Sequence, residues 1–245
     1  MPELPLGSVL YRAEERGRGS YGWLETRYSF SFADWYDPDR MGFGPLRVLN
    51  DDRIAPQSGF GAHGHRDMEI ITVVLQGEVV HKDSLGNATV IPAGDIQVMS
   101  AGSGVRHEEH NRSATEPLEL LQIWIEPWTT GLPPRYAQRT IGLGNLRSGW
   151  IHLVAPEPST TDALPIRQQA NVFWGTASAG ETLAGPPRTG QAVFLFLVSG
   201  RVRVGNIELG PRDALAIPHA GLDLSFVSLE PSQILYFDLP GLTQA

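Results

Sequence analysis

Short apolar segments, separated by turns rich in glycine and proline, run along most of the chain. Met68–Leu75 and Ala192–Val198 have about the length of a buried strand and are rich in β-branched or aromatic residues, which favour extended structure. Asp83–Asn87 (DSLGN) and Pro92–Asp95 (PAGD) contain the residue types that turns prefer. Helical patterns are scarce, so the sequence predicts an all-β protein.

The second half of the chain repeats the pattern of the first half. Ala192–Val198 runs into a glycine much as Ile71–Leu75 does, and Gly210–Asp213 (GPRD) resembles the PAGD turn of the first half. Such a repeat indicates a coarse internal duplication. We therefore expect two β-barrel domains packed face to face, one over residues 1–135 and one over residues 136–245.

Two pairs of potential metal ligands stand out in the first half: His63 with His65, and His107 with Glu109. Side chains two residues apart on a strand point to the same face, so neighbouring strands can bring the two pairs together. Three imidazoles and one carboxylate suit a transition metal, with Fe(II) preferred and Zn, Ni, Mn or Cu able to compete. The sequence predicts one such ion per chain. The second half has no paired histidines at the corresponding position and is expected to be metal-free.

Several residues near these pairs have competing interpretations. Glu69 shares strand parity with the first pair, so it is either a ligand or a hydrogen-bond partner of a ligand. His81 lies near a polar turn and is expected to be solvated. Glu108 and His110 have the opposite parity to the second pair and are expected at the surface, unless a bulge reverses them.

Composition limits the classes of protein that fit. Among 245 residues there is no cysteine, which excludes disulfides, Fe–S clusters and thiolate zinc sites. A net charge of -8 argues against direct binding of nucleic acid or of anionic membranes. No apolar run approaches the roughly eighteen residues that span a bilayer. The first residues contain no apolar core of a secretory signal, so we expect a cytoplasmic protein.

Six motifs extend over nearly the full length of the chain. They are Met41–Arg53 (MGFGPLRVLNDDR), His63–Glu69 (HGHRDME), Asp83–Asn87 (DSLGN), Ser100–Glu109 (SAGSGVRHEE), Tyr136–Arg139 (YAQR) and Phe237–Pro240 (FDLP). Their arrangement resembles the pirin family of two-domain cupins. Two positions differ from the common family pattern: Gly64 stands where proline is usual, and Glu108 where serine is usual. Neither change affects the four candidate ligands.

The resemblance implies a bicupin fold and metal ligation by the residues that match His63, His65, His107 and Glu109. It also implies an oxidoreductase of the quercetin 2,3-dioxygenase type, which uses O2 to open the ring of a flavonol-like substrate. In that reaction the 3-hydroxyl of the substrate loses a proton. Glu109, a carboxylate at the metal, is the expected base.

Two other functions fit the same candidate ligands. One is a non-catalytic regulatory protein that binds a protein partner according to the oxidation state of its metal. The other is a cupin isomerase that needs no O2. The sequence supplies ligands but no substrate contacts, so it does not separate these functions.

Overall fold

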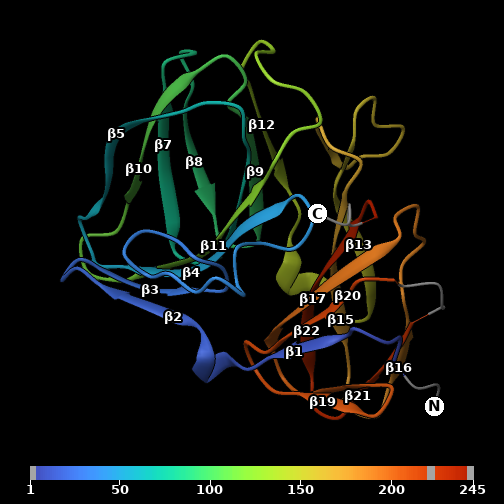
Figure 1. The fold of residues 1–245 in the computed structure, drawn as a ribbon. Helices are drawn as coiled ribbons and strands as arrows, with labels where there is room; N and C mark the ends of the chain where they lie inside the picture. The colour runs from blue at the N-terminus through green and yellow to red at the C-terminus, as the bar shows by residue number, and fades with distance from the viewer. Residues whose placement is uncertain (1–3, 220–223, 242–245) are drawn as a thin grey trace. The chain divides into compact units, whose positions relative to one another are not determined.

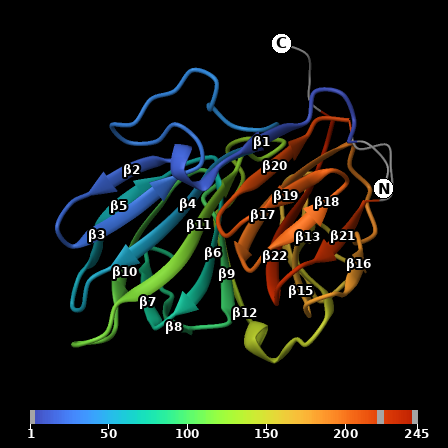
Figure 2. The same cartoon turned by 90° about the horizontal axis from the view of Figure 1, so that it is seen from below.

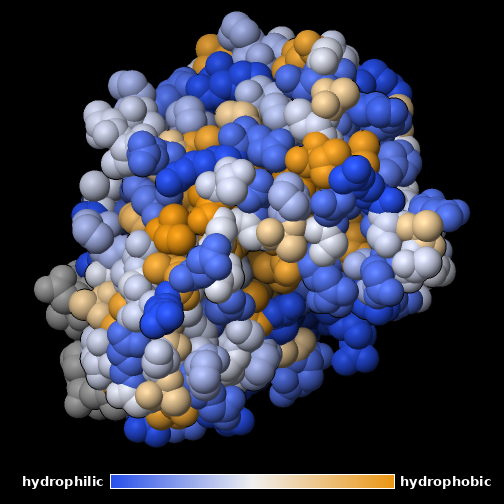
Figure 3. Space-filling view, turned by 180° about the vertical axis from the view of Figure 1, so that it is seen from behind, coloured by the Kyte–Doolittle hydropathy of each residue, from blue (hydrophilic) through white to orange (hydrophobic). Residues whose placement is uncertain are grey.

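The computed structural model describes residues 4–219 and 224–241, and these residues form β-strands joined by turns (Figure 1). Within those two ranges the helices are two short 3-10 turns, η1 (Ala13–Glu15) and η2 (Leu143–Asn145), and neither could cross a membrane. The prediction of an all-β protein is confirmed. The exposed face in Figure 3 is largely hydrophilic, with apolar side chains in small groups between charged and polar ones.

The chain divides into two compact units. The first contains Gly17–Gly144 and Leu164–Gln168, and the second contains the remaining described residues. The predicted domain boundary between residues 135 and 136 stays a prediction.

The first unit contains two antiparallel sheets (Figure 2). The larger follows the order β12-β9-β6-β11-β4-β3-β2, and the smaller follows β5-β10-β7-β8. The strands are β2 (Gly17–Ser20), β3 (Leu24–Tyr28), β4 (Leu46–Ile54), β5 (Gly59–His65), β6 (Glu69–Gln76), β7 (Glu78–Asp83), β8 (Ala88–Pro92), β9 (Asp95–Ser100), β10 (Val105–Asn111), β11 (Leu118–Ile125) and β12 (Arg135–Thr140), with the short β14 (Leu164–Ile166) also in this unit.

Apolar side chains from both sheets of the first unit pack against one another. One buried cluster joins Val79 of β7 and Ile91 of β8, in the smaller sheet, to Leu118 and Leu120 of β11, in the larger sheet. Alternation along each strand directs these side chains inward. The two sheets therefore pack face to face around a common interior.

The second unit is built in the same way. Its strands follow the orders β1-β20-β17-β22-β15-β13 and β16-β21-β18-β19. They are β1 (Val9–Tyr11), β13 (Gly149–Pro156), β15 (Asn171–Ala177), β16 (Thr182–Ala184), β17 (Ala192–Ser199), β18 (Val202–Val204), β19 (Ile207–Leu209), β20 (Ala214–Ile217), β21 (Ser225–Ser228) and β22 (Ser232–Leu239). Its interior contains a cluster of apolar side chains that includes Phe173, Phe226 and Tyr236. The repeated sequence pattern thus corresponds to a repeated two-sheet structure.

Strands β5 and β10 approach each other closely at Gly59. A Cβ atom at Gly59 would lie 2.2 Å from the carbonyl oxygen of Glu109 and 2.5 Å from Cα of His110. Beyond this point, three residues of β5 span the distance covered by two residues of β10, so β5 contains a bulge. The absence of a side chain at Gly59 allows the pairing that places His63 opposite His107.

We predict that Gly59→Ala lowers the free energy of unfolding by about 1–3 kcal/mol, the usual cost of overpacking, because the new methyl group clashes with backbone atoms of β10. Urea denaturation measures the loss. Gly61→Ala is the matched control on the same strand, because a Cβ there meets no atom within 4 Å. Equal stability of the two variants would contradict the role given to Gly59.

Candidate metal centre

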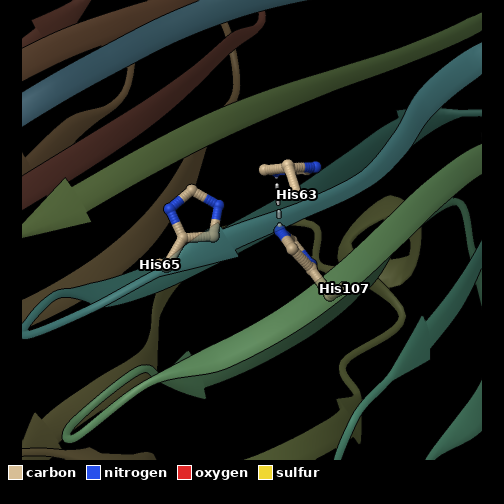
Figure 4. Close-up of side chains that lie close together, drawn as sticks. All are labelled: His63, His65 and His107. Atoms are coloured by element: carbon tan, nitrogen blue, oxygen red, sulfur yellow. Dashed lines mark hydrogen bonds between the residues drawn. The ribbon is translucent and has the colours of Figure 1, made fainter.

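Three histidine side chains converge at the pairing of β5 with β10. His63 and His65 come from β5 and His107 comes from β10, as Figure 4 shows. The Nε2 atoms of His63 and His107 lie 3.0 Å apart, and the three ring centroids are 4.5 to 4.9 Å from one another. One nitrogen of each ring lies within 4.8 Å of the others.

This arrangement fits a bound transition metal. Two ligands at right angles around an ion about 2.1 Å away lie about 3 Å apart, which is close to the separation of the two Nε2 atoms. The Nδ1 atom of His63 lies 2.7 Å from the carbonyl oxygen of Gly61. A proton on that Nδ1 leaves the lone pair on Nε2, which is the arrangement usual for a metal-bound histidine.

The lowered pKa values of two of the imidazoles also favour metal binding. Burial, together with the charge of the neighbouring His63, lowers the pKa of His65 to about 4. Burial also lowers the pKa of His107 to about 4, although the carboxylate of Glu109 acts in the opposite direction. Both imidazoles are therefore neutral at pH 7, the form that binds metal.

Glu109 lies on the same strand as His107, two residues further on, and its side chain is buried. Gln97 donates a side-chain hydrogen bond to Oε1, Gln122 donates to Oε2 at 3.1 Å, and the Thr72 hydroxyl lies 3.4 Å from Oε1. Burial alone would raise the pKa of Glu109, but the interactions with His81 and with Gln97 outweigh it and hold the pKa below its usual range. The buried carboxylate is therefore ionised at pH 7.

The three donors to Glu109 form a row across the larger sheet. Gln97 on β9 pairs with Thr72 on β6, and Thr72 pairs with Gln122 on β11. The Gln97 amide also donates to the Thr72 hydroxyl at 3.0 Å. These three residues are not among the site residues predicted from the sequence. The available signal was a single polar residue in the middle of each of three apolar strands.

A second group of potential ligands adjoins the first. One atom from each of His81, His107 and Glu109 lies within 4.8 Å of the others, so His107 belongs to both groups. In the part of the chain that the structure describes, the Glu109 carboxylate is grouped with His81 and His107 rather than with His63 and His65. Ligation of one ion by all four predicted residues stays a prediction.

The expectation that His81 is solvated is wrong, because its side chain is fully buried. Along β7, Val79 and His81 alternate with more exposed residues and point inward. The His81 Nε2 lies 3.1 Å from the Asp83 carboxylate, and its Nδ1 lies 3.9 Å from Glu109 Oε1. Burial alone would lower the pKa of His81, but these two carboxylates outweigh it and raise the pKa. The parity with Val79 was the sequence signal for this inward position.

The other acidic candidates lie elsewhere. Glu69 is buried, and its Oε2 accepts a hydrogen bond of 2.6 Å from the Ser100 hydroxyl, in the larger sheet. Burial raises the pKa of Glu69 above its usual value. Neither group of candidate ligands among the described residues contains Glu69. Glu108 and His110 retain 31% and 41% exposure of their side chains, and Glu108 pairs with Lys82 at 3.3 Å. The expected surface position of both residues is confirmed.

A surface depression of about 430 Å³ borders His65. Its lining includes the side chains of Arg66 and Arg106, together with Ser84 and Gly104. His65 therefore borders solvent, whereas the side chain of Glu109 is buried.

Comparison with known proteins identifies the family. Residues 11–125 match the family model described as Pirin, and residues 143–239 match that of the quercetinase C-terminal cupin domain. The chain is 40% identical over 234 residues to the quercetin 2,3-dioxygenase of Escherichia coli (strain K12). The aligned residues cover 94% of this chain and 98% of the relative. The chain belongs to the pirin family. This pirin is also 40% identical over 228 residues to a pirin-like protein of Caulobacter vibrioides, which covers 92% of this chain and 96% of that one.

The fold comparison agrees. The crystal structure of the bacterial pirin YhhW from Escherichia coli in complex with nickel(II) matches this pirin with a TM-score of 0.90 at 40% identity, over 96% of this chain and 100% of that one. This pirin therefore has the all-β two-domain cupin fold, as the sequence motifs predict.

The low pKa of His65 predicts how the stability of the metal-free protein changes with pH. The unfolded chain takes up a proton on His65 below about pH 6.5, whereas the folded chain takes it up only near pH 4. The contribution of His65 to stability therefore falls as the pH is lowered from about 6.5 to about 4. In the presence of a chelator, His65→Gln should lose less unfolding free energy than the native chain over this interval. Urea denaturation at several pH values measures the unfolding free energy of both proteins. Parallel plots of unfolding free energy against pH would contradict the lowered pKa of His65.

Proposed function

We propose that this pirin is a metal-dependent dioxygenase of the quercetin 2,3-dioxygenase type, which uses O2 to open the ring of a flavonol or a similar enol. The observation that carries the proposal is the convergence of three imidazoles from β5 and β10 beside a buried, ionised carboxylate. The Escherichia coli relative named quercetin 2,3-dioxygenase supports the proposal, because its match extends over nearly the full length of both chains.

The proposed cofactor is one divalent transition metal per chain, held by His63, His65, His107 and Glu109. Fe(II) suits this mixture of imidazole and carboxylate, and Zn, Ni, Mn or Cu can compete for it. The nickel(II) complex of the related YhhW supports a centre of this class. When bound, such an ion supplies a Lewis acid that orients the substrate and, in the case of iron, an electron carrier for O2.

Glu109 is the proposed base. It is ionised, so one of its carboxylate oxygens can accept the proton that the substrate hydroxyl gives up. Gln97 and Gln122 donate hydrogen bonds to the carboxylate from the opposite sheet. The side chains around it are buried, which keeps bulk water away from the transferred proton.

Oxygen uptake by metal-reconstituted protein, coupled to loss of the flavonol absorption of quercetin, tests this function directly. We expect turnover with Fe(II)-loaded native protein. We expect neither stoichiometric metal nor turnover in the His63→Ala/His107→Ala double variant, because it removes the two imidazoles whose Nε2 atoms are 3.0 Å apart. Elemental analysis gives the metal content. His152→Ala, in the second unit, is the matched control and should keep both properties.

Different results point to other functions. Turnover of an enol substrate without O2 would favour a cupin isomerase. Absence of turnover, with partner binding that differs between ferrous and ferric protein, would favour a regulatory protein. Stoichiometric metal in the double variant would place the metal outside this centre.

The role of Glu109 has its own test. Glu109→Gln keeps the shape of the side chain but removes the charge and the ability to accept the proton. We expect turnover per bound metal to fall by about a hundred- to ten-thousand-fold, the usual contribution of a general base. Activity is normalised to metal content because an amide is also a poorer ligand than a carboxylate. Unchanged normalised turnover would exclude Glu109 as the base.

A further inference from the structure

The carboxylate of Asp83 is fixed by the turn that it begins. Its Oδ1 accepts backbone hydrogen bonds from Leu85 at 2.9 Å and from Asn87 at 3.0 Å. Its Oδ2 accepts the Asn87 side-chain amide at 2.8 Å and lies 3.1 Å from Nε2 of His81. The Asp83 side chain is fully buried. Leu85 and Asn87 therefore hold both carboxylate oxygens in place independently of the His81 imidazole.

The imidazole of His81 is held by its surroundings in turn. Asp83 contacts Nε2, and the ring stacks on Tyr136 with centroids 4.7 Å apart and planes inclined by 26°. The Tyr136 hydroxyl is itself within 2.8 Å of the Thr89 hydroxyl. The remaining nitrogen, Nδ1, is buried without a hydrogen-bond partner, an arrangement that carries a free-energy cost. This nitrogen lies 3.9 Å from Oε1 of Glu109.

The pairing of β7 with β10 sets this contact. His81 lies directly opposite Glu109, and Asp83 lies directly opposite His107. The register is regular here, unlike that between β5 and β10. A distance of 3.9 Å is too long for a hydrogen bond, but a small movement of the Glu109 carboxylate toward His81 would form one.

We infer that His81 and Asp83 are positioning residues for Glu109, and that the turn at residues 83–87 thereby sets the metal affinity of the centre. Asp83 orients the imidazole through Nε2. When both ring nitrogens carry a proton, Nδ1 is the donor that faces the Glu109 carboxylate, from β7 and so on the other side of β10 from His63 and His65. The inference rests on the proposed role of Glu109 as a ligand. Loss of such a partner of a metal ligand typically lowers metal affinity or activity by about 10- to 100-fold.

The test is the dissociation constant for Ni(II), measured by chelator competition on initially metal-free protein. His81→Gln removes the nitrogen that faces Glu109, and we expect its constant to rise by about 10- to 100-fold. His81→Asn places an amide nitrogen near the position of Nδ1, so it should recover most of the loss. Asp83→Asn should weaken binding in the same direction, because it alters the group that orients the imidazole.

A spectroscopic measurement separates positioning from general damage to the fold. The visible absorption bands of Co(II)-loaded protein report the geometry of the ligands, so they should shift in His81→Gln and return toward the native spectrum in His81→Asn. Thermal unfolding checks that each variant is folded. His110→Asn is the control, since this histidine is on the same strand as Glu109 but 41% exposed. Its Ni(II) constant and spectrum should be unchanged.

Two results would overturn the inference. One is a native Ni(II) constant and a native Co(II) spectrum in folded His81→Gln and Asp83→Asn. The other is full metal retention in the His63→Ala/His65→Ala variant, followed by loss of the metal when His81→Gln is added to it. His81 would then be a direct ligand together with His107 and Glu109. Both readouts use metal alone, so a lack of dioxygenase turnover in the native protein leaves this test valid and counts only against the proposed function.

Discussion

The pairing of β5 with β10 is the constraint on which the candidate centre depends. His63 and His65 reach His107 only because this register places His63 opposite His107. The register in turn requires a residue without a side chain at Gly59, where the two backbones nearly touch. The bulge that follows lies on β5, so the alternation along β10 is uninterrupted and both His107 and Glu109 point inward.

The centre combines two environments on either side of His107. Toward β5 are partly exposed imidazoles, one of which borders a depression at the surface. Toward β7 and the larger sheet is a buried carboxylate that receives hydrogen bonds from Gln97 and Gln122. Low pKa values keep His65 and His107 neutral, and the low pKa of Glu109 keeps it charged, so each group is in its metal-binding form. The face-to-face packing of the two sheets makes this combination possible.

The sequence predicted the all-β fold, the repeat and the convergence of the histidines, because each follows from local spacing or from turn chemistry. Strand parity also placed Glu108 and His110 correctly at the surface. It did not reveal which strand lies beside which, since pairing is non-local. The polar turn after His81 suggested a solvated side chain, although His81 shares the parity of the buried Val79. Only the pairing with β10 shows that it lies opposite Glu109. Gln97 and Gln122 could not be predicted as site residues, since each is a lone polar residue whose partner, Glu109, is on the other sheet.

The most direct measurement of the central claim is anomalous X-ray diffraction at the metal absorption edge, on crystals of the metal-reconstituted protein. The account predicts one strong peak per chain in the first unit, about 2.0–2.2 Å from one nitrogen each of His63, His65 and His107 and from a carboxylate oxygen of Glu109. A peak elsewhere in the chain, or one at these histidines with both Glu109 carboxylate oxygens beyond coordination distance, would contradict it.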